Sequence, residues 1–273
     1  MQLVENLFSL RGRVAVVVGG AGQIGRETCR ILLDAGCRVA VMDVPGEHID
    51  AFVSDCNASL PDMAMGLPAD ITSEHAVEES RQRVMDRWGR VDILINHAHY
   101  KGGSRQLKPH DPFFAPFEDY PLEIWNETLR VNLTGLFVCC QKFGKEMLKA
   151  GSGSIINTSS TYGIVSPNHK IYGNSGINSP IAYATTKAAI INFTRYIATH
   201  WADRGVRANV LSPGGVANPA QSANFVENYA ERTPLARLAK AHEYQGAILF
   251  LASDASSYMT GANLVVDGGW TAW

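Results

Sequence analysis

Continuous apolar segments alternate with helical segments along most of this 273-residue chain, and this alternation limits the possible folds more than any other feature. The first apolar segment, residues 13–18, is rich in β-branched valine, and residues 24–35 after it have helical periodicity. Strands that are apolar on both faces need cover on both faces, as in a parallel sheet packed between helices. The pattern predicts strands at 13–18, 38–43, 63–68, 91–96, 153–159, 206–212 and 263–266, and helices at 24–35, 50–60, 73–88, 122–149, 183–203 and 242–253. We therefore expect an α/β fold, a doubly wound parallel sheet of about seven strands in a three-layer αβα arrangement.

Long irregular stretches interrupt this alternation at a few places. No linker, repeat or low-complexity tract divides the chain, so residues 1–273 are expected to form a single domain. The stretches 97–120, 160–181 and 214–237 each follow a predicted strand, at the edge where open α/β sheets bind their ligands. Because loops of this length are usually functional, we expect these three to form the walls of a substrate pocket.

Charge and composition argue against several classes of partner. With 24 basic and 26 acidic side chains the net charge is −2, which gives no reason to expect nucleic acid or an anionic membrane as a partner. The longest early apolar run, residues 14–18, is far too short to span a bilayer and does not have the pattern of a signal peptide. The cysteines have no metal-ligand spacing, so we expect no metal, a cytoplasmic location and reduced core thiols at Cys29, Cys37, Cys56, Cys139 and Cys140.

A glycine-rich turn joins the first predicted strand to the first predicted helix. Gly19, Gly22 and Gly25 lie between an apolar strand and a helix, which is the context that the dinucleotide-binding turn of Rossmann-type folds requires. Gly19 permits the tight turn, and Gly22 and Gly25 let the backbone approach a pyrophosphate at the amino end of the helix, where Gln23 and Ile24 lie. The alternative is a glycine-rich turn that binds no ligand.

Acidic residues end the second and third predicted strands. Asp43 could accept hydrogen bonds from the adenosine ribose hydroxyls and would repel a 2′-phosphate, so it predicts NAD rather than NADP. The alternative is an aspartate that caps the next turn. Asp70 and Ile71 could bind the adenine amino group and pack on its ring, although an aspartate alone at this place would more simply be the N-cap of the next helix.

Tyr183 and Lys187 are four residues apart in a predicted helix and therefore share one face. A tyrosine is a poor acid or base near neutrality, because its ordinary pKa is about 10. The positive charge of a lysine favours the phenolate, so we expect Lys187 to lower the pKa of Tyr183. A tuned proton donor beside a dinucleotide that carries a hydride is what the interconversion of a carbonyl and an alcohol requires.

These motifs and their order resemble the short-chain dehydrogenase/reductase family, in its single-domain branch, over essentially the whole chain. The resemblance also rests on Asn132, on Ser160, on Asn96-His97-Ala98-His99, on Pro213-Gly214 and on the tail 260–269. It implies that Tyr183 is the general acid or base, that Ser160 hydrogen-bonds the substrate oxygen, that Lys187 also binds the nicotinamide ribose, and that Asn132 holds a water linking Lys187 to solvent. The cofactor contacts that it and the motifs imply are Gly19, Gly22, Gln23, Ile24, Gly25, Asp43, Asp70, Ile71, Asn96, Ala98, Tyr183, Lys187, Pro213, Gly214 and Val216.

The chain departs from the family pattern at several places. Val18 stands where the family usually has threonine, and Gln23 takes the middle glycine position, a spacing closer to the extended branch of epimerases and dehydratases acting on nucleotide sugars. His99 replaces a glycine near the cofactor, and it is either a tolerated wall residue or an added titratable group. Ser160 and Tyr183 are farther apart than the family commonly shows, with the extra residues in 167–180.

The expected function is that of an NAD(H)-dependent oxidoreductase that interconverts a secondary alcohol and a ketone. Its substrate is expected to be polar, sugar-like or acidic, because the irregular stretches carry many polar side chains. One alternative is an NAD-containing sugar epimerase or dehydratase, and another is a non-catalytic dinucleotide-binding regulator. The predicted helices 122–149 and 183–203 carry more apolar surface than one sheet face needs, so with the family resemblance we expect a homotetramer or homodimer.

Overall fold

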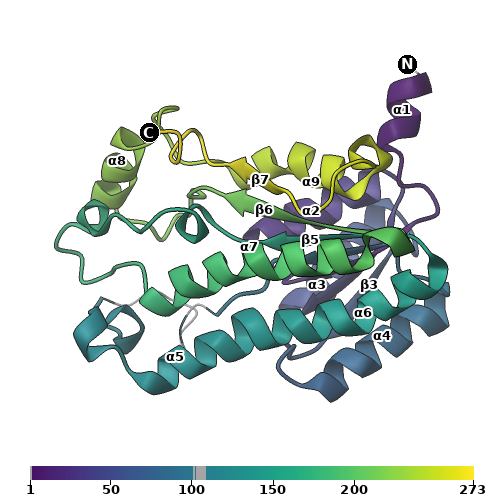
Figure 1. Ribbon diagram of the computed structural model, residues 1–273, viewed down its shortest axis with the longest axis horizontal. Coiled ribbons are helices and arrows are strands. Elements are labelled where there is room, and N and C mark those ends of the chain that lie inside the picture. The colour runs from purple at the N-terminus through teal and green to yellow at the C-terminus, as the bar shows by residue number, and fades with distance from the viewer. Residues whose placement is uncertain (1, 101, 103–108) are drawn as a thin grey trace.

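A parallel sheet forms the centre of the computed structural model, which describes residues 2–100, 102 and 109–273 (Figure 1). Within these residues, seven strands lie in the order β3-β2-β1-β4-β5-β6-β7, so the predicted doubly wound α/β fold is confirmed. From β1 the chain adds β2 and β3 on one side, and it then adds β4 to β7 on the other side of β1. The strand order therefore reverses between β1 and β4. The strands are β1 Val14–Val18, β2 Arg38–Asp43, β3 Ala64–Pro68, β4 Ile93–Asn96, β5 Gly153–Thr158, β6 Val206–Pro213 and β7 Asn263–Val266.

The side chains of β1 show how the sheet is covered on both faces. All five residues of this strand are buried, and successive side chains point to opposite faces. Val14, Val16 and Val18 pack into one core, whereas Ala15 and Val17 pack into the other. A strand that contributes to two cores has no face for a polar side chain, which accounts for the unbroken apolar run in the sequence.

Helices lie over each of these cores. One core packs under α4 (Glu74–Trp88), α6 (Leu136–Ala150) and α7 (Ile181–Trp201), and α6 and α7 run across the front of the molecule in Figure 1. The other core packs under α2 (Gln23–Asp34), α3 (Glu47–Ser59) and α9 (Gln245–Ala252). The alternation of strands and helices therefore places the carboxyl ends of the parallel strands along one edge, between the two helical layers.

Two helices are not predicted by the sequence pattern. α1 (Gln2–Phe8) precedes the first strand, and α8 (Ala223–Glu231) lies inside the stretch 214–237 that we expect to be irregular. Ser222 is the N-cap of α8, because its hydroxyl oxygen accepts a hydrogen bond from the Phe225 backbone N–H at 3.3 Å. The expectation of an irregular third stretch is therefore wrong for its central part.

The predicted helix 122–149 is interrupted in the structure. It consists of α5 (Leu122–Leu129), a π-helical segment (Arg130–Gly135) and α6. The buried Asn132 in this segment hydrogen-bonds to other parts of the chain, and a Cβ at Gly135 would come within 2.6 Å of the Ile71 side chain. The prediction of one continuous helix is wrong here, because the interruption depends on tertiary contacts that helical periodicity does not register.

The first two irregular stretches contain short 3₁₀ turns. These lie at Pro112–Phe114 and Phe117–Asp119 in the first stretch, and at Thr161–Gly163 and His169–Tyr172 in the second. Residues 101 and 103–108 of the first predicted loop lie outside the described residues. Among the residues that the structure does describe, no helix combines the length and the apolar character needed to cross a bilayer.

Candidate active site

A cleft of about 900 Å³ opens beyond the carboxyl ends of the central strands, at the point where the strand order reverses. It lies where ligands bind in open α/β folds. Except for Asn96 and Asn132, all the site residues predicted from the sequence line this cleft: Gly19, Gly22, Gln23, Ile24, Gly25, Asp43, Asp70, Ile71, Ala98, Ser160, Tyr183, Lys187, Pro213, Gly214 and Val216. The structure thus brings into one cavity residues that are up to about 200 positions apart in the chain.

The glycine turn forms one end of the cleft, and its glycines are required by close backbone contacts. Gly19 has a φ of +75°, and a Cβ there would lie 2.7 Å from the backbone nitrogen of Ala98. A Cβ on Gly25 would lie 2.1 Å from the carbonyl oxygen of Gly19, so α2 could not begin as close to the turn with any other residue. Gly22 is the N-cap of α2 and provides no side-chain oxygen, which leaves the first N–H groups of the helix available to an anion. This end of the cleft fits a dinucleotide pyrophosphate.

The cleft wall beside the glycine turn carries the Asp43 carboxylate, with Arg26 and His48 in the same lining. One carboxylate oxygen of Asp43 accepts a hydrogen bond from the backbone N–H of Ala21 at 3.0 Å, and the other accepts from that of Val44 at 2.9 Å. The capping that we considered as an alternative is therefore present, and the same carboxylate still lines the cleft. Asp70 also lines the cleft, but Ser73 is the N-cap of α4, so the alternative of Asp70 as that N-cap is wrong.

Asn96 does not face the cleft, which corrects its prediction as a cofactor contact. It is paired in register with Asn157 on the neighbouring strand β5, and its side-chain N–H donates to the Asn157 carboxamide oxygen at 2.8 Å. Asn157 in turn donates to the hydroxyl of Thr194 in α7 at 3.0 Å. Because successive residues of a strand point to opposite sides, the end of β4 turns Asn96 into the core of the molecule.

His97, whose role the sequence leaves open, lines the cleft and joins three elements there. Its Nε2 lies 2.9 Å from the hydroxyl of Thr28 in α2, and its Nδ1 lies 2.8 Å from the hydroxyl of Thr158 in β5. The Thr28 hydroxyl already donates to the Ile24 carbonyl, so it accepts from Nε2–H, which leaves Nδ1 to accept from Thr158. Burial, with a smaller contribution from the charge of Lys187, lowers the pKa of His97 to about 3. The imidazole is therefore a neutral connection between α2 and β5.

Ser160, Tyr183 and Lys187 converge at the other end of the cleft. Tyr183 lies in the first turns of α7, and the Nζ of Lys187, one turn later, is 5.6 Å from the centre of the Tyr183 ring. The ammonium donates to the carbonyl oxygen of Thr158 at 2.8 Å, and the hydroxyl of Ser159 donates to the carbonyl oxygen of Lys187 at 2.6 Å. These two hydrogen bonds hold α7 to the end of β5, so the extra residues between Ser160 and Tyr183 do not separate the set.

The pKa values of the two titratable groups in this set are governed by burial. Burial raises the pKa of Tyr183, and a hydrogen bond from Ser160 opposes that shift. Burial lowers the pKa of Lys187 to about 7, so its ammonium is only partly formed at neutral pH. The expectation that Lys187 lowers the pKa of Tyr183 is therefore wrong for this structure, because removing both groups from water disfavours the charged form of each.

Asn132 lies next to the cleft and contributes to its wall indirectly. Its side-chain oxygen accepts from the backbone N–H of Tyr100 at 2.7 Å, and its amide group donates to the hydroxyl of Thr186 at 2.9 Å. The side chain thus connects the segment after β4 with α7, beside Lys187. The role in holding a water stays a prediction.

An aromatic wall that sequence reasoning largely missed surrounds Tyr183. The ring of His99 meets that of Tyr183 edge-on, with 5.8 Å between their centres. Further along the wall, the hydroxyl oxygen of Tyr229 accepts from the backbone N–H of Gly215 at 2.6 Å and so fixes the turn after β6. The aromatic residues of the irregular stretches are the sequence signal for this wall, which includes Tyr100, Tyr162, Tyr172, Phe225 and Tyr229.

Comparisons with known proteins agree with this geometry. A family profile described as Enoyl-(Acyl carrier protein) reductase matches residues 19–271. D-threitol dehydrogenase from Mycolicibacterium smegmatis is 32% identical over 268 residues, which covers 97% of this chain and 95% of that protein. A short-chain dehydrogenase from Leptospira borgpetersenii, solved with bound NAD⁺, is 34% identical with a TM-score of 0.83 over 98% of this chain and 95% of that one. A gluconate 5-dehydrogenase from Burkholderia cenocepacia, solved with NADP and tartrate, is 28% identical with a TM-score of 0.86 over 99% of each chain.

These relatives are matched over nearly their whole length, and the profile spans both the glycine turn and the Tyr183–Lys187 pair. The chain therefore belongs to the short-chain dehydrogenase/reductase family of oxidoreductases.

Proposed function

We propose that this protein is an NAD(H)-dependent oxidoreductase that interconverts a secondary alcohol and a ketone on a polar, polyhydroxylated substrate. The observation that carries this proposal is the convergence of the glycine turn with Ser160, Tyr183 and Lys187 in one cleft. The family membership and the close glycine contacts support a nicotinamide dinucleotide as the cofactor. One domain would then hold both the cofactor and the substrate.

In this proposal, the chain's own residues handle the proton while the bound nicotinamide supplies or takes up the hydride. The phenol of Tyr183 donates its proton to the substrate carbonyl oxygen, or accepts one from the alcohol in the reverse direction. The hydroxyl of Ser160 donates to the same oxygen and stabilises its developing charge. Lys187, with a pKa of about 7, can gain or lose a proton close to the Tyr183 ring, and Asn132 positions the neighbouring helix.

We propose NAD rather than NADP because the Asp43 carboxylate lines the cleft close to the glycine turn. A 2′-phosphate beside this carboxylate would experience charge repulsion. We expect kcat/KM with NAD⁺ to exceed that with NADP⁺ by at least about tenfold, and Asp43→Ser to reduce the ratio. A clear preference of the wild-type protein for NADP⁺ would contradict this part of the proposal.

The polar substrate is supported by the hydroxyl-bearing side chains around Tyr183 and by the names of two similar proteins. Ser160 and Tyr172 line the cleft together with Tyr183. Threitol dehydrogenase and gluconate 5-dehydrogenase are both named for polyhydroxylated compounds. Such compounds offer several hydroxyl groups, which can pair with a wall of this kind.

The test is a panel of sugar alcohols, sugar acids, steroids and acyl thioesters, with reduction or oxidation of the nicotinamide followed by absorbance. We expect turnover of at least one sugar alcohol or sugar acid, and a kcat that is lower by about 10²–10⁴ in Tyr183→Phe. Turnover only of large apolar ketones would contradict the polar substrate. Product formation without net NADH would favour an epimerase or dehydratase, and a complete lack of turnover would favour a regulator.

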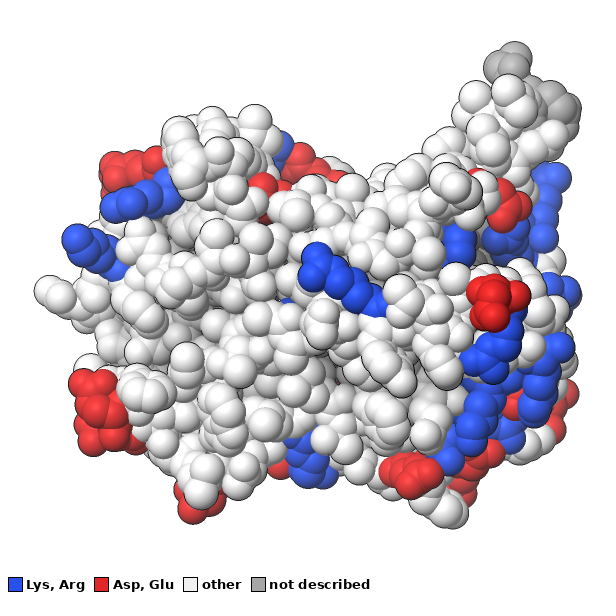
Figure 2. All heavy atoms as spheres, viewed as in Figure 1, with Lys and Arg blue, Asp and Glu red and all other residues white. Residues whose placement is uncertain are grey.

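We also propose that the protein is a homodimer or homotetramer in the cytoplasm. Large apolar side chains are exposed on the outer helices, with Leu122 at 65%, Phe137 at 47% and Tyr196 at 68% exposure. Figure 2 shows that charged side chains on the face carrying α6 and α7 gather towards its edges and are sparse in its middle. Such a face suits contact with a second copy. Sedimentation velocity tests this, and a monomer at micromolar concentration would contradict it.

A further inference from the structure

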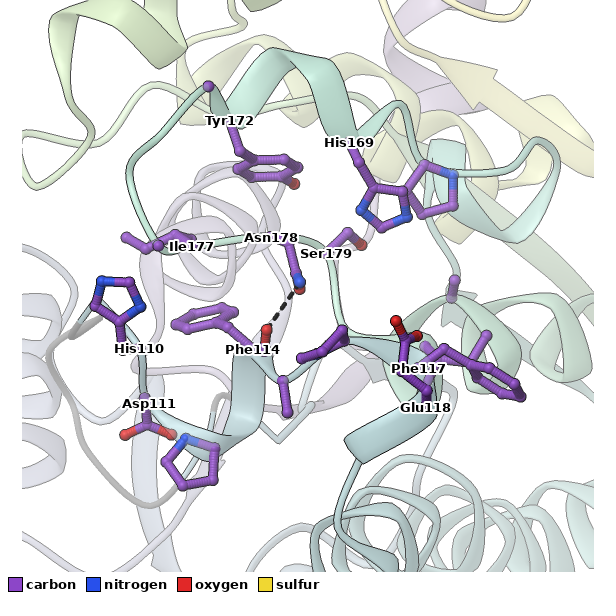
Figure 3. A pocket seen from close by; sticks show the side chains of 18 of the residues that line it. His110, Asp111, Phe114, Phe117, Glu118, His169, Tyr172, Ile177, Asn178 and Ser179 are labelled. Carbon is purple, nitrogen blue, oxygen red and sulfur yellow. Dashed lines mark hydrogen bonds between the residues drawn. The ribbon is translucent and has the colours of Figure 1, made fainter.

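A second pocket, of about 810 Å³, lies between two irregular segments, residues 110–118 and residues 166–181 (Figure 3). It reaches the first turn of α7, because Ile181 and Ala184 belong to its lining. Tyr183 lies between these two residues in the chain and lines the reaction cleft. The turn of α7 that carries Tyr183 therefore borders a cavity on one side and the cleft on another, instead of being enclosed by the core.

The ring of Tyr183 is only partly covered by the fold, since it faces the cleft. Long side chains on a helix commonly adopt either of two χ1 rotamers, so a partly covered ring needs neighbours that select one of them. The hydroxyl of Ser160 hydrogen-bonds the phenol, the Nζ of Lys187 lies 5.6 Å from the ring centre, and the ring of His99 lies 5.8 Å from it. His99 thus adds a ring contact to two polar contacts.

His99 is held in place at the end of β4. The backbone N–H of His97 donates to the Val18 carbonyl of β1 at 2.8 Å, and that of Tyr100 donates to the side-chain oxygen of Asn132 at 2.7 Å. The Nδ1 of His99 lies 3.2 Å from the His97 carbonyl oxygen and donates to it, because a carbonyl oxygen only accepts. These contacts fix both the backbone and the imidazole of His99 relative to the sheet.

The contact between the rings of His99 and Tyr183 has a favourable geometry. The ring planes are inclined at 64°, which is the edge-to-face arrangement that aromatic pairs prefer. A side chain without a ring at position 99 would leave this side of the Tyr183 ring open to the cleft. Neither of the roles that the sequence leaves open for His99, a tolerated wall residue or a titratable group, requires such a contact.

We propose that His99 is a positioning residue, whose ring holds the phenol of Tyr183 in the orientation from which it exchanges a proton with the substrate. This inference rests on the proposed function and adds a residue to its reactive set. His99 acts through Tyr183, and its own nitrogens take no part in the proton transfer. The proton donor is thereby fixed from the sheet, through the end of β4, and not from the second pocket.

Two substitutions separate the ring of His99 from its nitrogens. His99→Phe keeps a flat ring and has no side-chain nitrogen, whereas His99→Asn keeps a donor near the place of Nδ1 and has no ring. We expect kcat to fall by about threefold to tenfold in His99→Asn and by less than about twofold in His99→Phe, with the KM for NAD⁺ unchanged in both. The pH profile of kcat in His99→Phe should match that of the wild-type protein. His75→Asn is the matched control, because His75 is exposed on α4 and is not among the described residues that line the cleft.

Crystal structures of the same variants test the proposal without turnover. We expect one conformer of the Tyr183 side chain in the wild-type protein and in His99→Phe, and a displaced or second conformer in His99→Asn. An unchanged Tyr183 side chain in the His99→Asn crystal would overturn the proposal, as would an equal loss of kcat in both variants or no loss in His99→Asn. If the wild-type protein converts no substrate with NAD(H), the proposed function fails, and the conformer of Tyr183 still decides whether His99 positions it.

Discussion

The two cavities of this protein are built in different ways. The reaction cleft lies at the ends of buried strands, and its chemical groups are held by buried partners, as Lys187 is held by Thr158. The second pocket lies between two irregular segments, and several of its wall residues, such as Phe117 at 78% exposure, are largely open to solvent. This contrast indicates that packing in the core fixes the residues that perform the chemistry. Residues that select the substrate can instead lie on surface segments that contribute little to the stability of the fold.

The sharpest test of this comparison is Tyr183→Phe, which removes one hydroxyl from the cleft. We expect kcat to fall by about 10²–10⁴, because the proton donor is lost, while the cofactor affinity and the thermal midpoint stay nearly unchanged. Tyr258→Phe is the control, since that side chain is fully exposed. A loss of less than tenfold in Tyr183→Phe would remove the chemical distinction between the two cavities.

The next test is the acid sensitivity contributed by His97. The pKa of His97 is about 3 in the folded protein, below its ordinary value of 6.5. Between these two pH values the imidazole is protonated in the unfolded chain and neutral in the folded protein. Stability from this residue is complete above pH 6.5 and is lost as the pH falls towards 3. Between pH 6.5 and about pH 4 the loss should approach about 3 kcal/mol, at about 1.4 kcal/mol per pH unit.

Urea unfolding of His97→Asn over this pH range measures the effect of His97. The variant should be less stable at pH 7 and should depend less steeply on pH than the wild-type protein. Parallel curves for the wild-type protein and His97→Asn would contradict the neutral, buried state of His97.

A smaller effect is expected from Gly25→Ala in the glycine turn. The added methyl group would lie 2.1 Å from the Gly19 carbonyl oxygen, so α2 must shift, at a cost of about 1–3 kcal/mol in the free energy of unfolding. The affinity for NAD should fall as well, since the same backbone forms the end of the cleft. Gly246→Ala is the matched control, because a Cβ there meets no atom within 4 Å. Titration calorimetry and thermal unfolding measure both quantities, and equal behaviour of the two variants would refute the close-contact argument.

The smallest expected effect concerns the wall of the second pocket. Phe117→Ala should change the free energy of unfolding by less than about 0.5 kcal/mol, because the ring buries little surface, and should leave kcat for a polyol unchanged. Chemical denaturation and initial rates measure this. A large loss of stability would show that this wall belongs to the core, and the contrast between the two cavities would then disappear.

Local spacing predicted those parts of the site that depend on the backbone or on one helix. Gly25 follows from its place between a strand and a helix, and Tyr183 and Lys187 follow from their separation by one turn. The family resemblance implies that Asn96 contacts the cofactor, but the side of the sheet to which its side chain points depends on the register with Asn157. The π-helical segment at 130–135 and the pKa of Tyr183 depend on burial by distant elements, which a single sequence does not display.

The hydrogen bond between Ser159 and Lys187 closes the base of the segment that runs from Ser160 to the start of α7. Because this hydrogen bond fixes the distance between the two ends of the segment, insertions and deletions inside it leave that distance unchanged. The segment can therefore change in length during evolution while Ser160, Tyr183 and Lys187 stay together. During evolution, exchange of this segment alone could therefore change the substrate that the enzyme accepts. Grafting it onto another member of the family is the laboratory equivalent of that history.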